Sequence, residues 1–295
     1  MSKTKEVALI SGANGFLGKH IVAALKQKDI TTVSIPTTLL YKSPPEIIAF
    51  LQKHNPTIII HAAGYGNHGH QQEEDKIVMA NYFATWHLLN ASLYQDYKCF
   101  INISTSSVYG IKEEPMHEGM NLQPDTFYAA TKAGAMFLTR AYAKQYKKPT
   151  VNVLPFSVFG PGEADFRFIP TICKSLVRGE VMPFVSYPQH DWLYVDNFID
   201  GLLTVIDNID RVKGESVNIG TGESFTNRAI ADLMETISHK TLLKEENYQE
   251  QPHHSAKWKA VNLKLQSLGW TPRVSLQKGL QLTWKFYNEK YSAQA

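Results

Sequence analysis

The amino-acid sequence predicts an α/β protein with a doubly wound parallel sheet, followed by a smaller α/β segment. Short apolar runs alternate with longer amphipathic patterns through the first half of the chain, which is typical of βαβ units. Several short runs are almost entirely apolar, as expected of strands that helices cover on both faces. A glycine-rich turn follows the first of these runs, at the edge where open parallel sheets bind ligands.

The second half of the chain is less regular than the first. We expect "GPGEADFRFIP" and "VMPFVSYPQHD" to form loops around short elements. The expected strands are Val7–Ile10, Thr32–Ile35, Thr57–His61, Phe100–Ile103 and Thr150–Leu154. The expected helices are Phe16–Gln27, Pro45–His54, Glu74–Tyr94 and Thr126–Tyr146, then Asp196–Asn208, Asn227–Ser238 and Leu276–Tyr291.

Composition is ordinary for a globular protein, with 43% hydrophobic and 19% charged residues and a formal charge of +3. Lysines and acids are mixed along the chain, so we expect no nucleic-acid partner. No apolar run approaches the roughly 20 residues of a membrane span, and we expect no membrane partner. Cys99 and Cys173 lie in apolar stretches, which favours reduced thiols and a cytoplasmic protein.

The segment "VALISGANGFLG" places Gly12, Gly15 and Gly18 between the first strand and the first helix. Glycines there allow a tight turn and the close approach of a pyrophosphate, to which the helix start offers N–H donors. An acidic residue after the second strand would hold the ribose of NAD. The segment "VSIPTTLLYK" has no carboxylate, and Lys42 is the nearest cation. This pattern favours NADP(H) over NAD(H).

A hydroxyl cluster at Ser104–Ser107 follows the fourth strand, where it could bind a ligand or satisfy turn amides. Tyr128 and Lys132 follow on one face of the next helix, at i and i+4. Tyr94 and Lys98 have the same spacing without a hydroxyl cluster before them. The position behind the cluster, and not the spacing, therefore singles out Tyr128 and Lys132.

The glycine turn, "HAAG", "STSSVYG", "YAATK" and "VFGPG", in this order, resemble the extended short-chain dehydrogenase/reductase family of NAD-dependent epimerases and dehydratases. The segment "LGWTPRVSLQKGLQLTWKFY" resembles the C-terminal part of that family. The resemblance implies a Rossmann domain over residues 1–155, to which a segment near 187–210 could return. It implies a mainly substrate-binding domain over residues 156–295, with the active site between the two.

The resemblance also implies roles for individual residues. Tyr128 would exchange a proton with the substrate oxygen as hydride moves to or from nicotinamide, and Thr105 would hydrogen-bond that oxygen. Lys132 would favour the tyrosinate and bind the nicotinamide ribose. The expected cofactor contacts are Gly12, Asn14, Gly15, Phe16, Leu17, Gly18, Ala62, Ala63, Gly64, Asn81, Ile103, Tyr128, Lys132, Pro155, Ser157 and Val158.

Departures from the family narrow the reaction. Nucleotide-sugar dehydratases carry a segment that resembles "STDEVYG". In this sequence, Ser106 and Ser107 stand in place of its Asp–Glu pair. Decarboxylases keep a glutamate, and the epimerase/reductases related to GDP-fucose synthase keep a cysteine, where Ser107 stands. The remaining possibilities are reduction of a nucleotide-activated 4-keto-6-deoxy sugar and C4 epimerisation with tightly bound NAD. The short segment between the second and third strands favours the reductase, and a non-catalytic cofactor-binding relative is a third possibility.

The residues expected to bind the substrate match the family's pattern less closely. "HDWLYVDN" resembles the family's "RDFIHVDD", with His190 in place of a diphosphate-binding arginine, and "QPHH" (251–254) replaces a second one. Arg167 could compensate. The histidines at 61, 68 and 70 lack carboxylate or cysteine partners at ligand spacing, so we expect no metal. The expected substrate contacts are Tyr65, Asn67, Ser106, Ser107, Phe156, Phe159, Arg167 and His190.

The resemblance further implies a homodimer with a four-helix interface. The helices around 80–94 and 130–146 would form it, with four apolar side chains at the contact. Those side chains would suit a contact between helix and sheet equally well. They are Met79, Phe83, Trp86 and Phe137.

Overall fold

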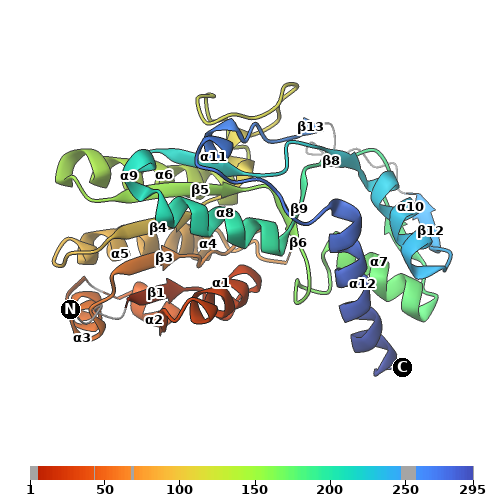
Figure 1. Cartoon of the computed structure of the whole chain (residues 1–295), viewed down its shortest axis with the longest axis horizontal. Helices are drawn as coiled ribbons and strands as arrows, with labels where there is room; N and C mark the ends of the chain where they lie inside the picture. The colour runs from red at the N-terminus through yellow and green to blue at the C-terminus, as the bar shows by residue number, and fades with distance from the viewer. Residues whose placement is uncertain (1–5, 43, 68–69, 247–256, 295) are drawn as a thin grey trace.

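The computed structural model describes residues 6–42, 44–67, 70–246 and 257–294 (Figure 1). Its central sheet has six parallel strands in the order β10-β5-β4-β3-β1-β2. The order reverses after β1, and this confirms the doubly wound prediction. The strands are β1 (Val7–Ser11), β2 (Thr31–Ile35), β3 (Ile58–His61), β4 (Cys99–Ile103), β5 (Thr150–Pro155) and β10 (Ser216–Ile219).

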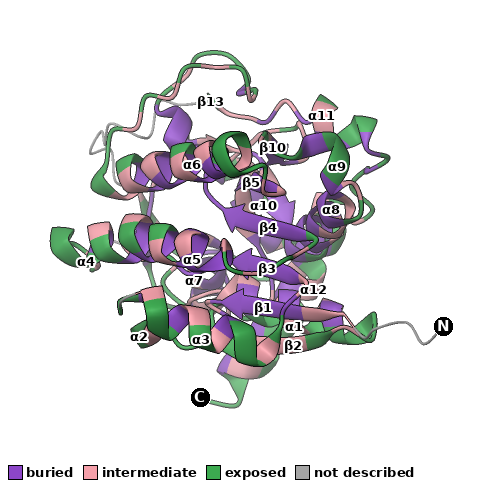
Figure 2. Ribbon diagram, turned by 90° about the vertical axis from the view of Figure 1, so that its left-hand side faces the viewer, coloured by how far each residue is buried: buried purple, intermediate pink, exposed green. Residues whose placement is uncertain are grey.

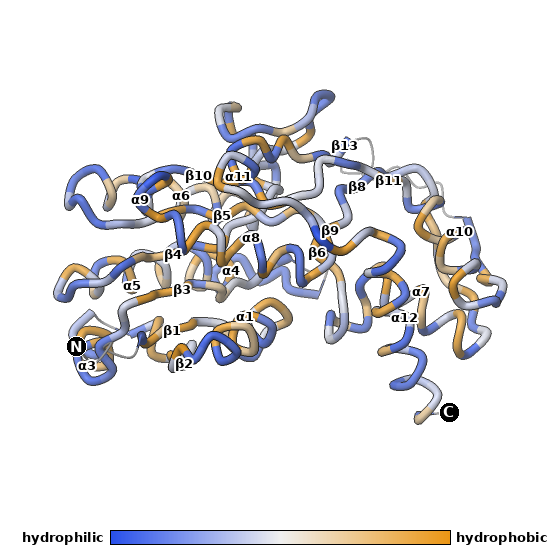
Figure 3. Tube along the Cα trace, viewed as in Figure 1, coloured by the Kyte–Doolittle hydropathy of each residue, from blue (hydrophilic) through white to orange (hydrophobic). Residues whose placement is uncertain are grey.

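The helices cover both faces of this sheet, and the strands show why. Ala8, Ile10 and Ile60 join a core beneath α1 and α8, whereas Leu9 and Ile59 join a core beneath α3 and α5. Alternate side chains point to opposite faces, so β1 and β3 carry apolar side chains on both faces. The buried strands lie between helix layers in Figure 2 and form the hydrophobic centre in Figure 3. The covering helices are α1 (Phe16–Gln27), α3 (Pro44–His54), α5 (Ala84–Ser92), α6 (Phe127–Tyr146) and α8 (Val195–Asp207).

The expected helix at Glu74–Tyr94 is interrupted. It consists of α4 (Glu74–Val78), a π-helical turn η1 (Met79–Phe83) and α5. Such turns are frequent at functional sites, and this one contains the fully buried Asn81. The remaining short helices are α2 (Thr37–Leu40), η2 (Ser106–Tyr109), α9 (Ile209–Val212) and α11 (Leu263–Ser267).

A second hydrophobic cluster holds the C-terminal part together, beside the carboxyl ends of the central strands (Figure 1). Phe159, Phe184 and Tyr287 are fully buried within it. Its helices are α7 (Phe168–Arg178), α10 (Asn227–Ser238) and α12 (Leu276–Ser292). Its strand pairs are β7 (Met182–Phe184) with β12 (Lys244–Glu246), β6 (Ser157–Phe159) with β9 (Trp192–Tyr194), and β8 (Gln189–His190) with β11 (Phe225–Thr226) and β13 (Lys257–Trp258).

Two elements differ from the sequence-based expectation. Helix α7 begins inside "GPGEADFRFIP", which we expected to be a loop. Pro170 lies in its first turn, where a missing backbone N–H costs no helical hydrogen bond. Strand β10 was not expected, because its sequence "SVNI" is short and half polar. It pairs with β5 and extends the central sheet by one strand.

The apolar side chains that the dimer prediction named lie at the surface of this chain. Met79, Phe83 and Trp86 are each more than one-third exposed, and Phe137 is 59% exposed. Dimerisation stays a prediction. In the described ranges, no helix combines the length and the apolar character that a membrane crossing requires.

Candidate active site

The glycine turn brings the start of α1 against the segment that follows β3. Gly12 has a φ of +70°, and a Cβ there would lie 2.8 Å from the backbone of Ala62 and Ala63. A Cβ at Gly18 would lie 2.0 Å from the carbonyl oxygen of Gly12. Helix α1 begins after Gly15, with no side-chain cap and no acidic residue in its first turn. The turn therefore presents uncapped backbone N–H groups, as the close approach of a pyrophosphate requires.

His61 fixes the segment opposite this turn. Its Nδ1 lies 2.7 Å from Ser11 Oγ and its Nε2 lies 3.0 Å from Thr85 Oγ1. Ser11 Oγ also accepts hydrogen bonds from the backbone N–H groups of Ala62 and Ala63. Burial, with the nearby charge of Lys132, lowers the pKa of His61 to about 3. His61 is therefore a neutral structural residue at physiological pH.

Asn81 positions the next part of the same segment from the π-helical turn. Its Oδ1 accepts from the backbone N–H of Tyr65, and its Nδ2 donates to the Tyr65 carbonyl and to Thr131 Oγ1. These bonds place Gly64 beside Lys132, so that a Cβ at Gly64 would lie 3.6 Å from Lys132 Nζ. Gly64 therefore presents its backbone, without a side chain, beside the ammonium group of Lys132.

Thr105, Tyr128 and Lys132 come together at the carboxyl end of β4, although the chain order separates them. The side chain of Thr105 lies close enough to the Tyr128 hydroxyl to act on its pKa. Lys132 is 4% exposed and donates to the carbonyl oxygen of Ile103 over 2.7 Å. Helix α6 begins at Thr126, whose side chain accepts from the Ala129 N–H. This cap fixes the first turn of the helix, which carries Tyr128.

Burial shifts both titratable groups toward their neutral forms. It raises the pKa of Tyr128, while the hydrogen bond with Thr105 and the charge of Arg167 act in the opposite direction. Burial lowers the pKa of Lys132 to about 8. Lys132 therefore remains largely protonated at neutral pH, next to a tyrosine that holds its proton. This pairing suits proton donation from Tyr128.

Two serines follow Thr105 and complete the hydroxyl cluster. Thr105 Oγ1 accepts from the Ser107 backbone N–H and donates to Ser107 Oγ. Ser106 Oγ accepts from Trp258 Nε1 over 2.7 Å. Trp258 lies far along the chain, and we did not predict it as a site residue. Neither serine is an acid, so this loop offers hydrogen bonds but no carboxyl group.

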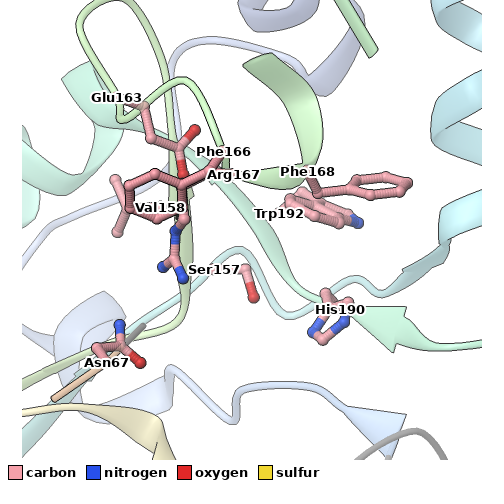
Figure 4. Close-up of a pocket in the computed structure, with 9 residues that line it drawn as sticks. All are labelled: Asn67, Ser157, Val158, Glu163, Phe166, Arg167, Phe168, His190 and Trp192. Carbon is pink, nitrogen blue, oxygen red and sulfur yellow. Dashed lines mark ion pairs between the residues drawn. The ribbon is translucent and has the colours of Figure 1, made fainter. Parts of the chain in front are cut away.

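A cavity of about 400 Å³ opens on the C-terminal side of this region (Figure 4). Its lining includes five of the predicted contacts, namely Asn67, Ser157, Val158, Arg167 and His190. It also includes Glu163, Phe166, Phe168 and Trp192, which we did not predict. The three predicted catalytic residues are not among the lining residues. The cavity is a candidate substrate pocket, and the charge of Arg167 in its lining acts on Tyr128.

Glu163 and Arg167 form the charged pair of this cavity. Glu163 Oε1 lies 3.4 Å from Arg167 Nε, and the Glu163 side chain is 10% exposed. Its Oε2 has no hydrogen-bond partner within the described part of the chain. Burial raises the pKa of Glu163 to about 7, against the opposing charge of Arg167. In Figure 4 the terminal nitrogens of Arg167 point away from Glu163, toward the side of the cavity where Asn67 lies.

The remaining predicted residues occupy different environments. Phe156 is 4% exposed and Phe159 is fully buried, and both belong to hydrophobic clusters. The ring of Phe159 packs 6.4 Å from that of Trp192, which lines the cavity. Tyr65 directs its hydroxyl to Glu73. Pro155 and Ile103 end β5 and β4, and Asn14, Phe16 and Leu17 lie in the glycine turn and the start of α1.

Asp191 is a buried acid that sequence reasoning missed, directly after His190. It is fully buried and accepts hydrogen bonds from Thr221 N–H and Oγ1, Gly222 N–H and Ala260 N–H. These donors come from two distant loops, so no local pattern could reveal them. Asp191 thereby anchors the strand that brings His190 and Trp192 to the cavity.

Among residues 6–42, 44–67, 70–246 and 257–294, no three His, Cys, Asp or Glu side chains lie together as metal ligands would. His61 is committed to Ser11 and Thr85. His68 and the "QPHH" segment at 251–254 lie outside the described residues.

Comparison with known families agrees with this geometry. The family model described as "NAD dependent epimerase/dehydratase family" matches residues 8–220. The chain belongs to this family. Its members are NAD(P)-dependent oxidoreductases and epimerases that modify nucleotide sugars. The glycine turn, the uncapped start of α1 and the bare backbone at Gly64 fit a nicotinamide dinucleotide.

Individual members of the family resemble the chain over nearly its whole length. CDP-abequose synthase of Salmonella typhimurium is 24% identical, over 95% of this chain and 98% of that protein. The structure of RMD from Pseudomonas aeruginosa, complexed with NADPH, has a TM-score of 0.86 at 20% identity, covering 97% of this chain and 100% of that one. UDP-glucuronic acid 4-epimerase from Bacillus cereus, in complex with UDP-glucuronic acid and NAD, also has a TM-score of 0.86, at 24% identity and the same coverage. These similarities show the Rossmann-like fold.

Proposed function

We propose that this protein is an NAD(P)-dependent reductase of a nucleotide-activated 4-keto-6-deoxy sugar. The observation that carries the proposal is the composition of the catalytic group. Tyr128, Thr105 and Lys132 provide one proton donor with its supports. Ser106 and Ser107 occupy the positions at which the dehydratase pattern "STDEVYG" has an Asp–Glu pair. A carbonyl reduction needs one proton donor, and water loss needs a second acid/base group.

Each residue of the site has its own role in the proposed reduction. The nicotinamide, when bound, supplies hydride chemistry at the carbonyl carbon. Tyr128 gives its proton to the carbonyl oxygen, which Thr105 orients by a hydrogen bond. Lys132 stabilises the resulting tyrosinate through its positive charge. Arg167 and His190 bind the anionic part of the substrate in the adjacent cavity.

NADP(H) remains our preferred cofactor. Strand β2 ends at Ile35 and is followed by Pro36 and the short helix α2, with no carboxylate to repel a 2′-phosphate. Lys42 lies near this end but is paired with Glu46 over 3.3 Å. The similarity to a structure that contains NADPH is compatible with this preference, and the similarity to an NAD-containing epimerase supports the alternative.

C4 epimerisation with tightly bound NAD is the second candidate function. The same three residues can remove a proton from a sugar hydroxyl and return it, because epimerisation passes through a 4-keto sugar. The overall similarity to UDP-glucuronic acid 4-epimerase favours this possibility. Cofactor retention separates the two, since an epimerase must regenerate its cofactor in place and a reductase must exchange it.

The test begins with the cofactor content of the purified protein and with NADPH and NADH titrations. NADPH oxidation is then followed with dTDP-, CDP-, GDP- and UDP-linked 4-keto-6-deoxy sugars. We expect turnover with at least one substrate, and a loss of about 100-fold or more in Tyr128→Phe. Tyr94→Phe is the matched control, because Tyr94 shares the spacing to a lysine but is 63% exposed. Retained NAD with interconversion of C4 epimers would establish the alternative, and unchanged turnover in Tyr128→Phe would refute the role of Tyr128.

A further inference from the structure

The Glu163–Arg167 pair differs from the other ion pairs of the described residues. Glu163 is 10% exposed, whereas every other acid in those ion pairs has a side chain at least 37% exposed. One oxygen of Glu163 faces Arg167 Nε and the other has no partner in the described chain. An unpartnered oxygen on a buried carboxylate is costly. The pair therefore contributes little as a structural support.

The environment of Glu163 is otherwise fixed and uncharged. The Tyr287 hydroxyl of α12 donates to the Glu163 carbonyl oxygen, and Cys173 of α7 lies close enough to sense its charge. Burial raises the pKa values of the Tyr287 hydroxyl and the Cys173 thiol, so both stay neutral near pH 7. Arg167 is therefore the one positive group that acts on Glu163 within the described residues. Across the cavity lies His190, and His70 contacts Phe166 at its edge.

Arg167 is in turn arranged to serve two anions. Its Nε faces Glu163, and its terminal nitrogens point into the other side of the cavity (Figure 4). Its backbone carbonyl accepts from the N–H and Oγ1 of Thr171, which fixes the start of α7. The backbone of Arg167 is therefore held at the cavity by bonds that do not depend on the charge of Glu163. A guanidinium binds phosphate well, so an incoming anionic group would compete with Glu163 for it.

We propose that Glu163 is a resident counter-ion of Arg167, which the anionic group of the substrate replaces while Glu163 takes up one proton. This inference rests on the proposed function, because that function supplies the anionic substrate. The proton passes from the buffer to a carboxylate oxygen of Glu163, and no other bond forms or breaks. Glu163 is a positioning residue that compensates the positive charge of Arg167 in the free protein and does not take part in the reduction itself.

Electrostatic linkage gives the direction of the effect. A second negative charge at Arg167 disfavours the ionised form of Glu163, so substrate binding raises the pKa of Glu163 above its value in the free protein. That value is about 7, so Glu163 is mostly ionised at pH 8 and mostly neutral at pH 6. The substrate should therefore bind more tightly as the pH falls from 8 to 6.

The experiment measures proton uptake during ligand binding. The holoprotein, saturated with its nicotinamide cofactor, is titrated calorimetrically in two buffers of different ionisation enthalpy. The probes are UDP-glucose, CDP-glucose, dTDP-glucose and GDP-mannose, whose diphosphates carry no group that titrates near neutral pH. We expect uptake of roughly half a proton per ligand at pH 7.5 with the probe that binds, and several-fold weaker binding at pH 8 than at pH 6.

Two variants assign the proton to its group. Glu163→Gln should abolish most of the uptake, tighten binding several-fold at pH 8 and flatten the pH dependence. Asp165→Asn is the matched control, because Asp165 lies in the same loop but pairs with Lys290 at the surface. It should behave as the wild type. Thermal unfolding and cofactor affinity show whether each variant is folded.

The outcomes are separable from those for the proposed function. Absence of uptake in the wild type overturns the inference, even if Glu163→Gln fails to fold. Uptake that persists in Glu163→Gln also overturns it and assigns the proton to His190 or His70. Binding without uptake leaves the reductase proposal intact, since NADPH oxidation tests that proposal directly. Absence of binding by every probe overturns the inference, and NADPH oxidation with the 4-keto-6-deoxy sugars then decides the proposed function by itself.

Discussion

The edge of the sheet that carries the glycine turn and the segment after β3 (the cofactor edge) differs from the neighbouring cavity in how far its polar groups are hydrogen-bonded. At the cofactor edge, His61 and Asn81 use their side-chain polar atoms in internal hydrogen bonds. In the cavity, Glu163 is buried with one oxygen unpartnered, and Arg167 turns its terminal nitrogens into the open space. A satisfied network holds one geometry, whereas an incompletely satisfied pair can gain by binding a ligand. The hydrogen bonds of the first region hold its backbone in one position, whereas the Glu163–Arg167 pair of the second can exchange its partners.

The largest effect should follow from breaking the packing of the cofactor edge. We expect Gly12→Ala to lower the free energy of unfolding by about 3 kcal/mol and to weaken cofactor binding at least about 100-fold. The added Cβ meets the backbone of Ala62 and Ala63 at 2.8 Å, and the φ of +70° adds strain. Urea unfolding and cofactor titration measure the two effects.

Gly179→Ala is the matched control for that substitution. Gly179 ends α7 with a φ of +66°, but a Cβ there meets no atom within 4 Å. The backbone strain is therefore the same and the close contact is missing, so we expect a loss of about 1 kcal/mol and normal cofactor binding. Equal losses in the two variants would show that strain alone, and not close packing, determines the cost at Gly12.

A second prediction concerns acid sensitivity of the same edge. The pKa of His61 is about 3 in the folded protein and about 6.5 when unfolded. Between these values the unfolded chain binds a proton that the folded protein does not, so stability falls as the pH falls below 6.5. We expect His61 to contribute about 2.5 kcal/mol of the stability lost between pH 7.5 and pH 4.5.

The variant His61→Gln isolates this contribution. Its unfolding free energy should be lower than that of the wild type at pH 7.5, because two buried hydrogen bonds change, but it should fall less between pH 7.5 and pH 4.5. His117→Gln, at an exposed position, should keep the full acid loss. An identical pH dependence in His61→Gln and the wild type would mean that His61 is not held neutral by burial.

The sequence was most informative about the cofactor edge, for a physical reason. The glycines at 12, 15 and 18 and the pair Tyr128 and Lys132 act within one turn or one helix face, so spacing along the chain reports their geometry. The bounds of α1 and α10 were predicted to the residue, because the glycine turn before α1, the Thr226 cap of α10 and the periodicity of both helices are local signals. The roles predicted for Tyr128, Lys132 and Thr105 stay predictions until the variants are measured.

The cavity was less predictable because its parts depend on distant segments. Glu163 is buried by α7 and by Tyr287 of α12, 124 positions away, and the start of α7 was expected to lie in a loop. Asp191 receives hydrogen bonds from positions 30 to 69 residues further along the chain. No local spacing encodes such contacts. Strand β10 was missed for a related reason, since pairing with β5 overrides the weak strand propensity of "SVNI".

The smallest predicted effect on stability concerns Lys132, which lies beside Gly64 and Ile103. Its charge is buried without a carboxylate partner among the groups that set its pKa, and burial alone lowers that pKa from 10.5 to about 8. Such a shift costs about 3 kcal/mol of stability at pH 7, of which the hydrogen bond to Ile103 returns about 1 kcal/mol. We therefore expect cofactor-free Lys132→Met to be inactive but more stable than the wild type, by about 2 kcal/mol at pH 7.

The pH dependence of this gain tests its cause. Between pH 8 and pH 10.5 the unfolded lysine keeps a proton that the folded one has lost, so the stability of the wild type rises with pH and the advantage of Lys132→Met shrinks. Urea unfolding at pH 7 and pH 10 measures the difference. Lys98→Met, which removes a 40% exposed lysine paired with Glu6, should change stability by less than about 0.5 kcal/mol at both pH values. The opposite result is a Lys132→Met protein that is less stable than the wild type by the same amount at both pH values. It would mean that the contacts of the lysine outweigh the cost of burying its charge.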